Sequence, residues 1–196
     1  MIYVHDLSQY ALGTKDEEPA ADESSGSGAA AGGTAQTVCA ALVAHVHRHP
    51  VVLMLQDTAS GEYRLPGGAV PAGEDEVVVL CRTLDRALAP AAAAVADGAV
   101  APVWRGRVQQ DRLLATYWRP HAARDVYPYL PVHVTTPAER INVYLAELPE
   151  RCALACARGT RLVAVPFYDL YDSSTVFGTI PSALPTLLSR FEFICC

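Results

Sequence analysis

This chain of 196 residues lacks several features that would assign it to a particular class of protein. No apolar run reaches the ~18–20 residues that a membrane-spanning helix needs. The start, Met1 to Asp6, has no cationic flank and no apolar core, so we expect no secretory signal peptide. The six cysteines lack the spacing of a secreted disulfide framework, which favours reduced thiols in the cytosol or nucleus.

Charge is also scarce, because charged residues make up only 18% of the chain and the net charge is −6. An acidic balance argues against a broad surface that grips phosphates. However, five acids gather in one N-terminal stretch, at Asp16, Glu17, Glu18, Asp22 and Glu23. Without them the chain is nearly neutral, and a compact nucleic-acid site remains compatible with its charge.

Residues 16–36 form a low-complexity segment without any aromatic residue, Val, Ile or Leu. Such a segment buries too little apolar area to offset its ordering entropy, so we predict a flexible loop. The loop interrupts what we expect to be a single domain over residues 1–196.

The rest of the chain alternates β-rich runs with turn signals. A helix is predicted from Gly73 to about Leu88, where apolar residues recur at spacings of three and four. Shorter helices are predicted at 166–171 and 181–190. Predicted strands cover 37–46, 51–56, 62–65, 103–109, 112–118, 140–148 and 161–165. Strands that outnumber helices, with one long helix after a Gly-Gly turn, indicate a layered α/β domain.

The long predicted helix carries part of a known motif. Gly68, five residues, Glu74, seven residues and Arg82 match the frame of the Nudix box, and Leu84 matches its aliphatic position. In Nudix hydrolases this loop and helix present several carboxylates to Mg²⁺ or Mn²⁺, because hard cations need oxygen ligands. The predicted helix and the loop before it therefore resemble those of the Nudix box.

The metal-binding glutamates of the motif are missing. Thr83, Arg86 and Ala87 stand where the box has glutamates. Asp85 is one residue early, which rotates it by about 100° round the helix. We therefore predict a protein that is not an enzyme and needs no metal or other cofactor, in which Glu74 and Arg82 pair structurally. The alternative is an active hydrolase of nucleoside diphosphate-linked compounds with a displaced metal site.

A narrower resemblance extends from Leu7 to Ile194. Its blocks are Leu7-x-x-Tyr10-x-x-Gly13-Thr14-Lys15, Leu65-Pro66-Gly67-Gly68, Gly73-Glu74-Asp75-Glu76, Trp118-Arg119-Pro120, Tyr127-Pro128-Tyr129-x-Pro131, His133-x-Thr135-x-Pro137, Leu162-Val163-Ala164, Leu170-Tyr171-Asp172 and Leu184-Pro185-x-Leu187-Leu188-Ser189-Arg190-Phe191-x-Phe193-Ile194. These blocks resemble the small Nudix-fold subunit of pre-mRNA cleavage factor Im, also called cleavage and polyadenylation specificity factor subunit 5.

The resemblance implies an α/β Nudix fold, with a mixed β-sheet sandwiched between helices. It also implies a nuclear homodimer that acts in mRNA 3′-end processing, binds UGUA elements in single-stranded RNA and holds a larger RRM-containing subunit. A second alternative is a protein scaffold that makes no RNA contact.

The positions that read RNA in that family are largely changed here. Glu62 replaces the base-stacking Phe, Cys39 replaces a glutamate, and residues 16–36 contain no arginine. Because single-stranded RNA is read by stacking and by hydrogen bonds to base edges, we predict weak or altered RNA binding. The RNA-binding positions that the resemblance retains are Leu65, Phe177 and Gly178.

The partner-binding positions of the family are better retained, at Tyr127, Tyr129 and Leu187. Aromatic anchors with an aliphatic neighbour often concentrate the binding energy of an interface. The alternative is that these tyrosines are core or loop packing in a Pro-rich turn.

Three other groups of residues admit a functional and a structural interpretation. His45, His47 and His49 would share one face of a strand as a metal cluster or lie at an exposed strand end. Cys152 and Cys156 are expected to be buried small hydrophobes. A basic stretch would track RNA or form the solvent face of a strand, and it contains Arg105, Arg107, Arg112, Arg119 and Arg124. Cys195 and Cys196 are given no role.

Overall fold

The structure is a computed structural model that describes residues 1–15, 33–90, 100–120 and 125–196. Its strands are β1 (Ile2–Val4), β2 (Tyr10–Lys15), β3 (Ala35–Val46), β4 (His49–Asp57), β5 (Tyr63–Arg64), β6 (Gly67–Ala69), β7 (Val108–Arg119), β8 (Glu139–Ala146), β9 (Cys152–Ala157), β10 (Thr160–Pro166) and β11 (Phe193–Cys195). The helices are a 3₁₀ turn at Leu7–Gln9, α1 (Glu76–Leu88), α3 (Phe167–Leu170), α4 (Ser174–Phe177) and α5 (Thr179–Leu188). None of these helices has the length and apolarity of a membrane span.

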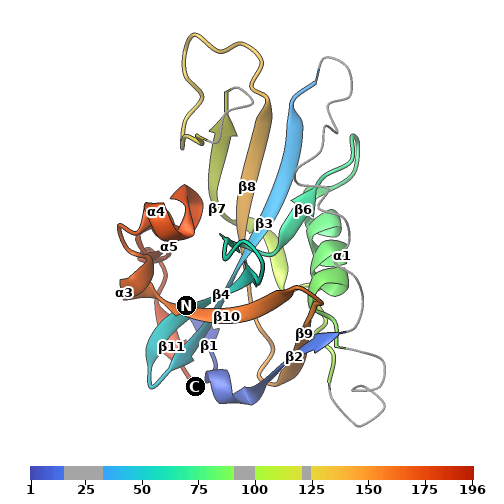
Figure 1. Cartoon of the computed structure of the whole chain (residues 1–196), viewed down its shortest axis with the longest axis vertical. Helices are drawn as coiled ribbons and strands as arrows, with labels where there is room; N and C mark the ends of the chain where they lie inside the picture. Colours follow the sequence, from blue (N-terminus) through green and yellow to red (C-terminus); the bar gives the residue numbers. More distant parts are fainter. Residues whose placement is uncertain (16–32, 91–99, 121–124) are drawn as a thin grey trace.

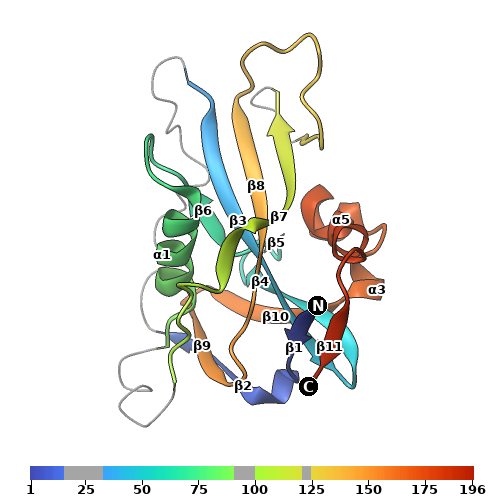
Figure 2. The ribbon, with the colours of Figure 1, turned by 180° about the vertical axis from the view of Figure 1, so that it is seen from behind.

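The centre of the fold is a mixed sheet with the strand order β10-β4-β3-β8-β7. The strands β5 and β6 extend it by pairing with β4 and β3. The β3–β8 pair is parallel, whereas β3–β4, β4–β10 and β7–β8 are antiparallel. Figure 1 shows α1 on one side of the sheet and α3, α4 and α5 on the other, and Figure 2 shows the same layers from behind. The predicted α/β class, a mixed sheet between helices, is confirmed.

Strand β3 supplies side chains to both faces of the sheet, because successive side chains of a strand point in opposite directions. Val38, Ala40 and Leu42 are buried in the cluster that α1 covers. Ala41 and Val43 are buried in the second cluster, together with residues of α5. The apolar run of β3 is thus explained by burial on both faces.

Two small sheets, each a parallel pair of strands, lie outside the central sheet. Strand β1 pairs with β11, so the first and last described strands lie side by side (Figure 1). Strand β2 pairs with β9. The side chain of Lys15, at the end of β2, donates a hydrogen bond of 2.6 Å to the carbonyl oxygen of Arg86, which ties this pair to the last turns of α1.

Most predicted elements are confirmed, with ends within two residues: β3, β4, β5, β8, β10, α3 and α5. Helix α1 begins at Glu76 rather than Gly73, because Gly73 has a positive φ of 84° in the preceding turn. The strands predicted at 103–109 and 112–118 are replaced by one irregular strand, β7. Strand β9 was not predicted. Residues 16–32 of the predicted loop lie outside the described residues, and its last two residues already belong to β3.

Candidate functional site

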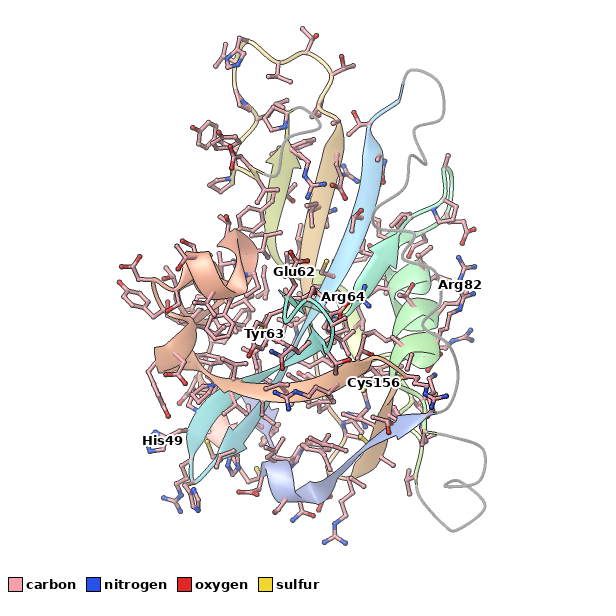
Figure 3. All side chains as sticks on the ribbon, viewed as in Figure 1. His49, Glu62, Tyr63, Arg64, Arg82 and Cys156 are labelled. Carbon is pink, nitrogen blue, oxygen red and sulfur yellow. The ribbon has the colours of Figure 1, made fainter. Side chains whose placement is uncertain are left out.

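The entry to α1 is built by the residues that match the Nudix box. Asp75 is the N-cap, and its side chain accepts hydrogen bonds from the backbone amides of Val77 and Val78 at 2.9 and 3.1 Å. Glu74 lies just before the helix and forms an ion pair with Arg82, at 2.9 Å between Nη2 and Oε2. Arg82 lies on the outer side of α1 (Figure 3). The predicted Glu74–Arg82 pair is confirmed, but both side chains are exposed, so it contributes little stability.

The first residue of α1, Glu76, is bound by side chains of β8. Its carboxylate accepts hydrogen bonds of 2.7 Å from the Asn142 amide and from the Tyr144 hydroxyl, and it pairs with the Arg140 guanidinium. Partial burial of Glu76 acts to raise its pKa, but the hydrogen bonds from Tyr144 and Asn142 and the charge of Arg140 outweigh burial. The pKa of Glu76 is therefore lowered, and the residue serves as an ionised anchor between helix and sheet.

The second half of α1 holds the positions at which the Nudix box has glutamates. The Thr83 hydroxyl donates a hydrogen bond of 2.9 Å to the Val79 carbonyl oxygen, and its methyl group faces Gly68. Arg86 is exposed. Asp85 is a carboxylate next to these positions. Burial raises its pKa, and the charge of Arg105 acts to lower it. Among the described residues no group of three or more His, Cys, Asp or Glu side chains is placed to hold a metal ion.

An aromatic pair lies on the other side of the sheet, between β5 and α4. The rings of Tyr63 and Phe177 meet edge to face, with centroids 4.9 Å apart. Leu65 is buried in the second core cluster, and both rings and Cys39 pack against that cluster. Gly178 follows Phe177 with a φ of 88°, and its backbone links α4 to α5.

The structure thus brings Leu65, Phe177 and Gly178 into one region, together with Tyr63, which the sequence had not singled out. Figure 3 shows Glu62, Tyr63 and Arg64 in succession beside this region. Tyr63 and Leu65 pack inward, and Glu62, at the position of the family's stacking ring, is an exposed carboxylate.

The candidate partner-binding residues flank the edge strand β7. Tyr127 pairs with Trp118 of β7 through two backbone hydrogen bonds of 2.7 and 2.9 Å. Tyr127 and Tyr129 are 37% and 59% exposed, with ring centroids 5.9 Å apart. Leu187 lies half-buried on α5, which also contacts β7. The tyrosines form an exposed aromatic pair rather than core packing.

The three histidines do not share a face. His45 is buried in β3, with Nδ1 3.5 Å from the Asp6 carboxylate and Nε2 3.0 Å from the Cys196 carbonyl oxygen. His47 lies in the β3–β4 turn with a positive φ of 50°, and His49 is exposed in β4 (Figure 3). The metal interpretation is therefore wrong for this trio, because the turn separates its members.

The cysteines of β9 and part of the basic stretch have structural roles. Cys152 and Cys156 are both buried, as expected, and Figure 3 shows Cys156 on β9. Arg112 forms an ion pair with Glu147 at 2.8 Å, and Arg119 forms one with Glu139 at 2.6 Å. These pairs favour the structural interpretation for both arginines. Arg124 lies outside the described residues.

Comparisons with known proteins agree with this fold. A family model described as "Nucleotide hydrolase", NUDIX_2, matches residues 1–191. Among solved structures, a Caenorhabditis elegans Ap4A hydrolase is 13% identical, with a TM-score of 0.53 over 81% of this chain and 97% of that one. The Mycobacterium smegmatis Nudix hydrolase RenU is 16% identical, with a TM-score of 0.51 over 83% and 90%. At such identities these likenesses show the fold alone.

Curated relatives are more similar in sequence. The chain is 35% identical over 153 residues to the Dictyostelium discoideum cleavage and polyadenylation specificity factor subunit 5, covering 78% of this chain and 72% of that protein. It is 32% identical over 200 residues to the Arabidopsis thaliana pre-mRNA cleavage factor Im 25 kDa subunit 2, covering 98% and 95%. The chain therefore belongs to the Nudix family and, within it, to the 25 kDa subunits of pre-mRNA cleavage factor Im.

Proposed function

We propose that this chain is a non-catalytic, homodimeric subunit of a nuclear complex for pre-mRNA 3′-end processing. It binds a larger RRM-containing subunit and contacts single-stranded RNA only weakly or in an altered mode. The observation that carries the non-catalytic part is the second half of α1, where Thr83, Arg86 and Ala87 stand in place of metal ligands. The relatives named as cleavage factor subunits support the process.

The partner surface in this proposal is the exposed pair Tyr127 and Tyr129 with Leu187. Large aromatic rings that are exposed in the free chain and held on a paired backbone segment are suitable anchors for an interface. The backbone of Tyr127 is fixed by its bridge to Trp118, so less ordering entropy is lost there on binding. Because none of the rings belongs to the core clusters, they can be shortened without opening the core.

The test is affinity purification of the tagged full-length chain from its own cells. Replacing Tyr127 and Tyr129 with Ala should reduce recovery of the RRM-containing subunit by roughly tenfold or more, as for interface anchors. Val132→Ala, on the same segment and fully exposed, is the matched control. Unchanged recovery with the double variant, or an absence of polyadenylation factors with the wild type, would contradict the proposal.

Weak RNA binding follows from the aromatic region between β5 and α4. Glu62 offers a carboxylate where a stacking ring would stand, and an aromatic stack contributes about 1–3 kcal/mol per base. Tyr63 and Phe177 already cover part of each other's surface. A fluorescence titration of the isolated protein should therefore show no preference for a UGUA-containing RNA over its scrambled control. Tight, UGUA-selective binding would refute this part of the proposal.

A further inference from the structure

Helix α3 and the two residues after it carry four exposed side chains that we call the α3 patch: Tyr168, Asp169, Tyr171 and Asp172. The two tyrosines are 71% and 65% exposed. The residue between the two Tyr-Asp pairs, Leu170, is fully buried. The patch thus lies on the outside of α3 and of the turn that follows it, and Leu170 anchors this segment in the core.

The backbone that carries the α3 patch is held in place by ring packing and by hydrogen bonds. Phe167, at the start of α3, packs edge to face on Phe193 of β11, with ring centroids 6.0 Å apart. Backbone hydrogen bonds join the Tyr171 amide to the Phe167 carbonyl and the Ser173 amide to the Leu170 carbonyl. Tyr168 and Asp169 lie in α3, and a second Tyr-Asp sequence, Tyr171 and Asp172, follows in the turn after it, so two rings and two carboxylates are exposed within five residues.

The chain segment around the α3 patch carries only negative charge. From Leu162 to Ser189 the sequence contains no Lys, Arg or His, and its charged residues are Asp169 and Asp172. No hydrogen bond or ion pair within the described residues engages either carboxylate. The patch therefore offers aromatic faces beside carboxylates that no described cation neutralises.

We propose that the α3 patch binds an arginine-rich segment of a protein partner. A guanidinium group stacks on a tyrosine face through a cation–π contact and donates two parallel hydrogen bonds to a carboxylate, so the arginines of such a segment can use both the rings and the carboxylates of the patch. Lysine carries the same charge but lacks the planar fork, and it fits such a pair less well. The carboxylates repel phosphate groups, which makes RNA an unsuitable occupant.

The α3 patch lies apart from the partner-binding residues Tyr127 and Tyr129, but α5, which carries Leu187, packs against α3. Figure 1 shows α3 low on the molecule, between β10 and α5, whereas the segment that carries the two tyrosines lies near the upper end of β7. Binding of an arginine-rich segment is therefore measured on the isolated chain, without the RRM-containing subunit.

The experiment is a fluorescence anisotropy titration of the full chain with labelled octa-arginine, and with octa-lysine for comparison. Octa-arginine should bind more tightly than octa-lysine. Replacing Tyr168 and Tyr171 with Ala should weaken octa-arginine binding by roughly tenfold, from the loss of two exposed cation–π contacts. Replacing both with Phe should leave it nearly unchanged, because Phe keeps the ring face.

The carboxylates are tested with Asp169→Asn combined with Asp172→Asn. Asn also tolerates the positive φ of 55° at position 172, so the backbone turn is retained. The matched control is Asp111→Asn with Glu150→Gln, two exposed acids in β7 and in the β8–β9 connection, which changes the net charge equally.

The variant with Asp169→Asn and Asp172→Asn should weaken octa-arginine binding markedly, and the control variant should leave this binding unchanged. Equal binding of the two peptides, equal loss in the control, or a single-stranded oligouridine that competes at the patch would overturn the proposal.

Discussion

Glu76 is a carboxylate of the Nudix helix that binds side chains rather than a metal ion. Three side chains of alternate residues on β8, Arg140, Asn142 and Tyr144, converge on it. The sequence contains a signal for this site, since a polar or aromatic residue occupies every second position of an otherwise apolar strand. Its partner on α1 could not be predicted, because that depends on how the helix lies across the sheet.

Replacing Glu76 with Gln should therefore destabilise the fold in a pH-dependent way. The folded state holds the pKa of Glu76 below its ordinary value of 4.5, so it binds the proton less readily than the unfolded chain does. The stabilisation is complete at neutral pH and is lost as the pH falls below about 4.5. We expect Glu76→Gln to lower the free energy of unfolding by roughly 2 kcal/mol at neutral pH, from lost bonds to a charged acceptor.

The measurement is urea unfolding at pH 7 and at a pH near 4, where the difference between wild type and variant should narrow. Glu150→Gln is the control, because Glu150 is exposed. An equal difference at both pH values would show that the ionised form of Glu76 is not what anchors the helix.

Among the elements, α1 was predictable and β9 was not. Helix α1 follows a clear apolar periodicity, and its start was misplaced only because Gly73 and Glu74 belong to the turn before it. Strand β9 has the sequence Cys-Ala-Leu-Ala-Cys-Ala, which contains no β-branched residue and no alternation of polar and apolar residues. It is a strand because β2 pairs with it and the core buries both of its faces. Such long-range pairing leaves no local signal in the sequence.

The N-cap of α1 gives a prediction at this scale. Asp75 accepts two backbone hydrogen bonds at the helix start, where a carboxylate also meets the positive end of the helix dipole. Asp75→Ala should lower the free energy of unfolding by about 1 kcal/mol, whereas Asp75→Asn, which keeps the acceptor, should cost less. Chemical unfolding of both variants measures this difference. Equal losses would mean that the capping bonds are not what Asp75 contributes.

For the whole molecule, the layers of the fold were predictable, but the placement of single functional side chains was less so. The spacing of Gly68, Glu74 and Arg82 and the pattern of predicted strands were sufficient to predict the Nudix architecture. By contrast, nothing in the sequence placed Tyr63 against Phe177, since that contact depends on tertiary packing. The missing metal ligands were readable because the absence of glutamates at three positions of the Nudix box needs no tertiary information.

That absence can be tested by reversing it. Thr83, Arg86 and Ala87 lie on α1 within one helical turn, and the scaffold around them matches that of Nudix hydrolases. If the loss of carboxylates alone abolished metal binding, then Thr83→Glu, Arg86→Glu and Ala87→Glu together should restore it, since several converging oxygens are what Mg²⁺ or Mn²⁺ requires. A ligand that binds only the folded state at 100 times its Kd stabilises by about 2.7 kcal/mol.

The triple variant should therefore gain several degrees in Tm on adding Mn²⁺, whereas the wild type should gain none and should release no phosphate from Ap4A. Thr83→Gln, Arg86→Gln and Ala87→Gln together form the control, with similar side-chain size but no added carboxylates. Mn²⁺-dependent stabilisation or Ap4A turnover by the wild-type chain would show that its metal site was displaced rather than lost, and would make it an enzyme.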